Sequence, residues 1–141
     1  MRAPLALIED TPADDERVIS LRGEIDVGST TALREWLKRA SEGGTRSVAV
    51  DFRNVDFLAV SGLYVLCDEQ ARMARHRARL TIVCTNRRIL QLFDVCRLTD
   101  VLRVVDSRAA LDVAGWDGED DERLRRLDAW LERYAAGSSP A

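Results

Sequence analysis

The clearest pattern of apolar and polar positions lies in residues 47–66. It opens with a continuous apolar run that ends at Asp51 and Phe52. A polar break over residues 53–56 separates this run from a second apolar patch, and a helix-patterned run begins at Leu63. A short apolar run rich in β-branched residues is typical of a buried strand in a parallel sheet. These residues therefore predict a strand, a turn and the start of a helix, which is where α/β proteins usually place their sites.

Two strands and one helix are predicted before this stretch. Residues 4–8 form an apolar run, and residues 9–15, which include a proline, predict a turn. Residues 17–23 alternate between apolar and polar, so the first two strands are expected to form a hairpin. Apolar residues at helical spacing then predict a helix over residues 30–41, which Gly43-Gly44 end.

Strands and helices alternate after the central stretch. The sequence predicts a strand over residues 80–83, a helix that Thr85 or Asn86 caps, a strand over residues 101–105 and a short helix through about Val113. The resulting order is ββαβαβαβα. We therefore expect an α/β fold over residues 1–113, in which a mixed, mostly parallel sheet carries packed helices.

A C-terminal extension, residues 114–141, follows this domain. It predicts a helix over about residues 121–135, capped by Asp120 or Asp121, and a disordered end from Gly137. The helix carries a narrow apolar stripe, which consists of Leu124, Leu127, Leu131 and Tyr134 beside Trp130. Two interpretations stay open, because the stripe can pack against its own domain or can grip a partner, including a second copy in a homodimer.

Composition excludes several classes of protein. A chain of 141 residues with 46% hydrophobic and 32% charged residues fits an ordinary globular protein of one domain. No apolar run is long enough for a membrane span or a secretory signal, so we expect a cytoplasmic protein. The net charge is −3, and the excess of acids lies in the extension, which does not fit a nucleic-acid-binding surface.

The chain carries little chemistry for catalysis or metal binding. Its three cysteines, Cys67, Cys84 and Cys96, are widely spaced and fit buried thiols in a reducing compartment. Its only histidine, His76, lies away from them in sequence. The sequence contains no glycine-rich phosphate loop and no nucleophile motif. We therefore expect no enzyme, no metal site and no cofactor.

Two other charged features, Asp51 and a basic run over residues 72–79, do not indicate a separate function. Asp51 at a strand end also fits a phospho-receiver domain, but that family needs a lysine near the last strand. The only lysine here, Lys38, lies in the first predicted helix, so this alternative fails. A basic run over residues 72–79 fits the C-terminal end of the second helix, where cations suit the helix dipole.

Four groups of residues, in this order and at this spacing, resemble the STAS domain, the sulfate transporter and anti-sigma-factor antagonist domain. They are Gly23-Glu24-Ile25-Asp26; residues 48–52, 55–58 and 61–63 of the central stretch; residues 80–86 before Leu90 and Phe93; and residues 96–102. The resemblance covers residues 4–113, and it is particularly to the bacterial single-domain anti-sigma-factor antagonists.

The resemblance implies regulation of transcription by protein–protein interaction. Such antagonists bind an anti-sigma factor, usually a serine kinase of the histidine-kinase-like ATPase fold, and so release a sigma factor. The kinase phosphorylates the antagonist at the start of the second helix, and a phosphatase of the PP2C type resets it. A phosphate adds about −1.5 to −2 charge, which suits a helix N-terminus but spoils a surface that docks a partner.

The chain departs from the family at this phosphorylation motif. The family's pattern is Asp-Ser-Ser/Thr-Gly; aligned with it, Ala59 takes the place of the aspartate and Val60 the place of the acceptor. Valine cannot carry phosphate, so we expect binding without the usual switch. Ser61 is an off-register acceptor in one interpretation and a plain N-cap of the helix in the other.

The contact surface that the resemblance implies comes from three segments. Its residues are Asp26, Gly28, Ser29 and Thr30; Ala59, Val60, Ser61, Gly62 and Leu63; and Thr85 and Asn86. The first segment also fits a helix-capping turn. Two alternatives remain for the function: a scaffold that binds a kinase or phosphatase without releasing a sigma factor, and a domain of the same fold that senses a small ligand.

Overall fold

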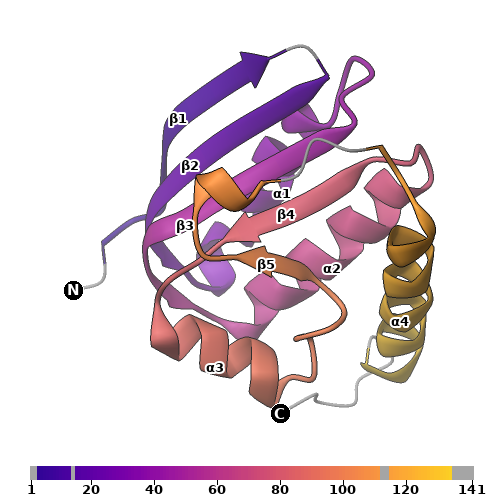
Figure 1. The fold of residues 1–141 in the computed structure, drawn as a ribbon. Helices are drawn as coiled ribbons and strands as arrows, with labels where there is room; N and C mark the ends of the chain where they lie inside the picture. Colours follow the sequence, from indigo (N-terminus) through magenta and orange to yellow (C-terminus); the bar gives the residue numbers. More distant parts are fainter. Residues whose placement is uncertain (1–2, 14, 112–114, 135–141) are drawn as a thin grey trace.

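The computed structural model describes residues 3–13, 15–111 and 115–134, which form a five-stranded sheet with helices around it (Figure 1). The strands are β1 (Ala6–Ala13), β2 (Glu16–Ile25), β3 (Ser47–Leu58), β4 (Arg79–Val83) and β5 (Arg103–Val105). They lie in the order β1-β2-β3-β4-β5, and β1 pairs antiparallel to β2 while the other pairs are parallel. The predicted mixed, mostly parallel sheet is confirmed.

The described residues include four α-helices and two short 3₁₀ turns. The helices are α1 (Thr30–Ala40), α2 (Val60–Ala74), α3 (Arg87–Val95) and α4 (Gly118–Tyr134), and the turns are η1 (Val27–Ser29) and η2 (Arg108–Ala110). This order confirms the predicted alternation of strands and helices. The short helix predicted before Val113 is the 3₁₀ turn η2, and residues 112–114 lie outside the described residues.

Alternation along β3 separates the two faces of the sheet. Val48, Val50 and Phe52 are fully buried in one core. Leu33 of α1 and Leu66 of α2 belong to the same core, and Figure 1 shows both helices on this face. Burial of one such side chain stabilises a fold by about 1.5–3 kcal/mol, so this face supplies the main stabilising contact.

The opposite face of the sheet holds a cluster of charges. Asp51 is buried on β3 and accepts hydrogen bonds from the guanidinium groups of Arg53, at 2.7 Å, and Arg108, at 3.0 Å. Arg108 also pairs with Glu9 of β1, so the cluster ties η2 to this face (Figure 1). Burial by itself raises the pKa of Asp51, but the hydrogen bonds outweigh it and hold that pKa below its ordinary value.

Several predicted boundaries are wrong, and β5, for example, begins two residues after the predicted start. β1 runs on through the predicted turn, because an edge strand tolerates Pro12 and because an Arg17–Asp10 ion pair holds it to β2. β3 continues through the predicted polar break, because residues 54–58 pair with the end of β2. Helix α2 begins at Val60, three residues before the predicted start.

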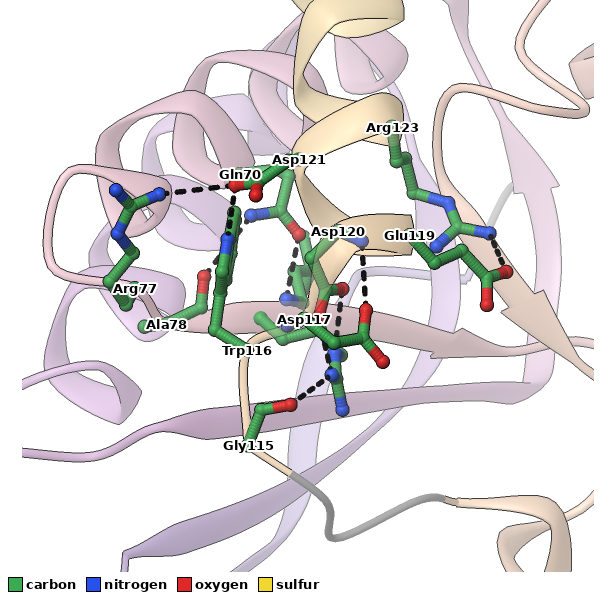
Figure 2. Close-up of polar contacts among 12 residues, drawn as sticks. Gln70, Arg77, Ala78, Gly115, Trp116, Asp117, Glu119, Asp120, Asp121 and Arg123 are labelled. Atoms are coloured by element: carbon green, nitrogen blue, oxygen red, sulfur yellow. Dashed lines mark hydrogen bonds and ion pairs between the residues drawn. The ribbon is translucent and has the colours of Figure 1, made fainter.

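Helix α4 is fixed to the sheet by a buried ion pair (Figure 2). Arg79, the first residue of β4, donates to the two carboxylate oxygens of Asp120 at 2.9 and 2.5 Å, and the side chains are 6% and 4% exposed. Arg79 also donates to the carbonyl of Gly115. Burial by itself raises the pKa of Asp120, but the hydrogen bonds, first those from Arg79, outweigh it and lower that pKa.

The start of α4 differs from the prediction. Its cap is Asp117, whose carboxylate accepts from the amide of Asp120 at 3.1 Å. The carboxylate of Asp120 accepts in return from the amide of Asp117 at 3.0 Å and also binds β4, and Asp121 accepts from the indole N–H of Trp116 at 2.7 Å. The predicted N-cap is wrong because α4 begins at Gly118, before both of these residues, whose carboxylates also hold the helix to the domain (Figure 2).

The arginines of the basic run, residues 72–79, make two different kinds of contact. Arg72 lies in the last turn of α2, where a cation suits the dipole. Arg77 and Arg79 instead bind the start of α4. The prediction that the run ends α2 is therefore confirmed for its first part only.

The apolar stripe of α4 packs against its own domain. Leu127 is fully buried, and the buried Trp130 donates its indole N–H to the carbonyl of Cys96 at 2.8 Å. The hydroxyl of Tyr64 on α2 donates to the carbonyl of Tyr134 at 3.1 Å. Leu127, Trp130 and Tyr134 of the stripe are thus buried within one chain, while Leu124 and Leu131 are partly exposed, and a homodimer through the stripe stays a prediction. The predicted disordered end lies outside the described residues.

The three cysteines are free and buried, as predicted. Burial raises the pKa of the thiols of Cys67, Cys84 and Cys96, so they are poor nucleophiles. None of the helices that the structure describes is long and apolar enough to cross a membrane.

Candidate functional site

The three predicted segments meet at the carboxyl ends of β2, β3 and β4, which are neighbours in the sheet. The amide of Ala59 donates to the carbonyl of Ile25 at 2.8 Å, which joins the end of β2 to the start of α2. The carboxamide of Asn86 donates to the carbonyl of Val55 at 3.4 Å, which joins the third segment to β3. We call the resulting surface the carboxyl edge; it consists of residues 26–30, 59–63 and 85–88.

Gly23 sets the direction of the first segment. Its φ is +99°, which favours glycine, and a Cβ there would lie 2.2 Å from the carbonyl oxygen of Pro4. Asp26 and Ser29 then close a small turn, because the Ser29 hydroxyl accepts from the amide of Asp26 at 2.9 Å and lies 3.2 Å from its carboxylate. These contacts fit the helix-capping interpretation of the segment.

The tip of this turn presents Val27 to solvent. Its side chain is 78% exposed, the highest fraction among the large apolar side chains of the described residues. Gly28 beside it is exposed, and the hydroxyl of Thr30 donates to the carbonyl of Val27 at 3.1 Å. The predicted contact loop, residues 23–30, includes Val27, but Val27 was not singled out in it, since a single valine between an aspartate and a glycine belongs to no pattern.

Helix α2 begins at the centre of the carboxyl edge. Ala59 occupies the N-cap without a side-chain hydrogen bond, and Val60 is the first helical residue and partly exposed. Ser61 lies in the first turn, so its predicted role as N-cap is wrong; Ala59 takes that position because β2 binds its amide. The Oγ of Ser61 is buried and makes no hydrogen bond to any described residue.

Gly62 and Leu63 position the helix. A Cβ on Gly62 would lie 2.6 Å from Cδ1 of Leu58 and 2.8 Å from Cγ2 of Ile25. Leu63 is fully buried in the core. Helix α2 therefore lies directly against the ends of β2 and β3, and of the five predicted contact residues in this segment, residues 59–61 are partly exposed.

Asn86 caps α3, which decides between the two predicted caps. Its carboxamide oxygen accepts from the amides of Arg88, at 2.9 Å, and Ile89, at 3.4 Å, while Thr85 is exposed. Arg87 and Arg88 follow the cap, and both side chains are exposed. They were not among the predicted contact residues. The sequence does carry a signal for them, because acids and not arginines are favoured directly after a cap.

The carboxyl edge combines apolar, hydroxyl and charged side chains. Its side chains include one carboxylate, four hydroxyl groups and two guanidinium groups around Val27 and Val60. Within the part of the chain that the structure describes, no group of three His, Cys, Asp or Glu residues could hold a metal ion. Apolar side chains with polar groups around them are typical of a surface that contacts another protein.

Comparison with known proteins identifies the family. A family model of the STAS domain matches residues 8–111, so the chain belongs to this family and the resemblance seen in the sequence is confirmed. Relatives named anti-sigma-B factor antagonist come from Staphylococcus aureus, at 29% identity, and Staphylococcus epidermidis, at 30%, each over 97 residues. Each match covers 69% of this chain and 90% of the relative.

The fold is also that of a solved structure. An anti-sigma factor antagonist from Mycobacterium paratuberculosis matches with a TM-score of 0.67 and 16% sequence identity, over 89% of this chain and 95% of the other. This likeness confirms the fold. Helix α4 lies outside the residues that the family model matches.

Proposed function

We propose that this protein is an anti-sigma-factor antagonist, which binds a serine-kinase anti-sigma factor of the histidine-kinase-like ATPase fold through the carboxyl edge and so frees a sigma factor. The name of the staphylococcal relatives supports this role, and the chain covers 90% of their length. The observation that carries the proposal is the edge itself, in which hydrogen bonds hold three loops and leave Val27 exposed. A preorganised surface of this kind loses little conformational entropy when a partner docks.

The family's usual phosphorylation position has no hydroxyl group in this chain. Val60, the first residue of α2, stands where the family has its phosphorylated hydroxyl residue. The neighbouring Ser61 Oγ is buried, so a kinase would have to rearrange the helix start to reach it. The proposed antagonist is therefore always competent to bind, and a PP2C-type phosphatase has nothing to reset at this position.

Val60→Ser tests the missing switch. The variant and the wild type are each incubated with a purified serine-kinase anti-sigma factor of the source organism and Mg-ATP, and phosphate is located by mass spectrometry. We expect phosphate at position 60 of the variant and none on the wild type. Val60→Ala is the control, which should bind and stay unmodified. Phosphate on Ser61 of the wild type would contradict an unswitched antagonist.

Ser61→Asp tests where the partner docks. The new carboxylate would have to lose its water in the contact, so we expect binding at least about tenfold weaker in calorimetry. An acid suits the first turn of a helix, but the Oγ of Ser61 is buried, so the melting temperature is measured as well and affinity is compared for folded protein. Ser61→Ala is the control and should bind like the wild type. Equal affinity of the aspartate variant and the wild type would place the interface elsewhere.

A further inference from the structure

Two arginines lie where a helix disfavours positive charge. Arg87 and Arg88 are the first two residues of α3, and its first turn contains no acid. The free N–H groups at this end give a helix a partial positive charge, so a cation here is repelled. Both side chains are exposed, and neither forms an ion pair with any residue that the structure describes.

Other helices of the protein follow the dipole. Helix α1 has Lys38 and Arg39 in its last turn, and α4 has three acids in its first turn. Among the described α-helices, α3 is the one whose first turn carries basic residues. The two arginines therefore do not stabilise their own helix, and their placement requires another explanation.

The position of Arg87 and Arg88 beside the carboxyl edge explains their placement. Asn86, directly before the arginines, is bound to β3 through the carbonyl of Val55, so the start of α3 is part of the carboxyl edge. Leu90, which follows them in α3, is 37% exposed, and Val27 lies exposed on the first segment of the same edge. The edge therefore combines exposed apolar side chains with two free guanidinium groups, and protein interfaces likewise have an apolar centre and a polar rim.

The charges of this edge favour an acidic protein surface as the occupant. A guanidinium group binds a carboxylate through two parallel hydrogen bonds, which makes arginine the preferred cation in protein contacts. Nucleic acid fits less well, because the net charge is −3 and because Asp26 and the exposed Asp56 lie at the same end of the sheet.

We propose that Arg87 and Arg88 form a basic rim of the docking surface, and that the partner protein places carboxylate side chains against this rim. The inference rests on the proposed function and adds the chemistry of the contact, which is an acidic patch beside an apolar one. The rim would then select among anti-sigma factors by charge, because a partner with basic residues at this position would be repelled.

Charge reversal with a matched control tests the rim. The double variant Arg87→Glu/Arg88→Glu is compared with the wild type and with Lys38→Glu/Arg39→Glu, which changes the net charge equally at the far end of α1. Each serine-kinase anti-sigma factor of the source organism is purified separately, and its affinity is measured by calorimetry at low and high salt. The melting temperature of each variant is measured alongside.

The two double variants should behave in opposite ways. With the anti-sigma factor that the wild type binds, the Arg87/Arg88 variant should bind at least about tenfold more weakly and with less salt dependence. Its melting temperature should stay the same or rise by about 1–2 °C, since acids suit a first turn. The Lys38/Arg39 variant should melt earlier and keep its affinity within about twofold.

Each other outcome overturns a stated claim. Wild-type affinity in the Arg87/Arg88 variant would overturn the basic rim and leave the proposed function intact. Equal weakening by both double variants would show an effect of net charge, which also overturns the rim. A wild-type protein that binds none of the anti-sigma factors would overturn the proposed function and this inference together.

Discussion

The two ends of the parallel strands use their charged residues differently. At the amino end, Arg79 is buried against Asp120, and the ion pair fixes α4 to the sheet (Figure 2). At the carboxyl edge, Arg87 and Arg88 have no ionic partner among the described residues, and Val27 is exposed. At the amino end the charged groups contact other parts of the protein, whereas at the carboxyl edge they remain exposed to solvent.

This difference separates stability from binding. Removal of one partner from a buried ion pair typically costs about 3–5 kcal/mol, because a charge is left without its counter-ion. A cation at a helix start costs about 0.3–1 kcal/mol. The amino end therefore holds the molecule together, while the carboxyl edge gives up a small amount of stability, as a surface kept for a partner would.

Asp120→Ala should have the largest effect. It removes one partner of the buried ion pair with Arg79, and we expect the largest loss in the free energy of unfolding, up to about 3–5 kcal/mol, measured with urea. The double variant Arg79→Met/Asp120→Leu removes both charges and should recover most of the loss. Folded Asp120→Ala protein should still bind the partner, and weak binding by folded protein would contradict the separation of the two ends.

Gly23→Ala should have the second-largest effect on the free energy of unfolding, and it should also disturb the carboxyl edge. Its Cβ would clash with the carbonyl oxygen of Pro4 at a positive φ, so we expect a loss of about 2–4 kcal/mol in urea denaturation. Gly43→Ala is the control, because φ is also positive there but no atom lies within 4 Å; it should cost about 1–2 kcal/mol. Folded Gly23→Ala protein should bind weakly, and wild-type affinity would show that the direction of the first segment is unimportant.

Asn86→Ala should cost less, because it removes a helix cap and one hydrogen bond to β3. We expect a loss of about 1 kcal/mol in the free energy of unfolding and weaker partner binding, since the third segment is released from Val55. Asn86→Asp keeps the cap oxygen and should lose less stability. An unchanged melting temperature in Asn86→Ala would contradict the capping role.

A fall in pH should have the smallest effect on the free energy of unfolding. This effect should come from the ion pair at the amino end of the strands. The lowered pKa of Asp120 means that its stabilising contribution is complete above the unfolded value of about 3.9 and is lost as the pH falls through the lower folded value. Urea denaturation between pH 2 and pH 6 should therefore show a fall below about pH 4. The fall should be less steep in Arg79→Met/Asp120→Leu, and identical slopes would contradict the role of the pair.

The order of the elements was predictable because each element carries a local signal. The apolar run before Asp51 marked β3, and helical spacing marked α1 within one residue of its observed end. The starts of α2 and α4 were not predictable in this way. Ala59 is an N-cap because the distant Ile25 binds its amide, and α4 begins at Gly118, before Asp120, whose carboxylate binds the distant Arg79. Such contacts leave no trace in the neighbouring sequence.

The candidate site was predictable in outline. The resemblance named three segments that follow strands, and parallel strands bring such segments to one edge. Which side chains are available could not be read from the sequence, because Leu63 and Val60 are both apolar residues of one helix start and only Val60 is exposed in part. Exposure depends on how α2 lies against β2 and β3.

The position of Trp130 gives the molecule an optical property. The indole lies between the rings of Tyr64 and Tyr134, with ring centroids 5.3 and 5.2 Å away, and is the most buried of the three tryptophans. An indole that passes from an apolar site into water emits at longer wavelength, so the emission of Trp130 reports whether α4 stays on α2. Tyr64 follows Val60 by one helical turn. The chain thus contains its own fluorophore on α4, and the state of the extension can be followed without an attached dye.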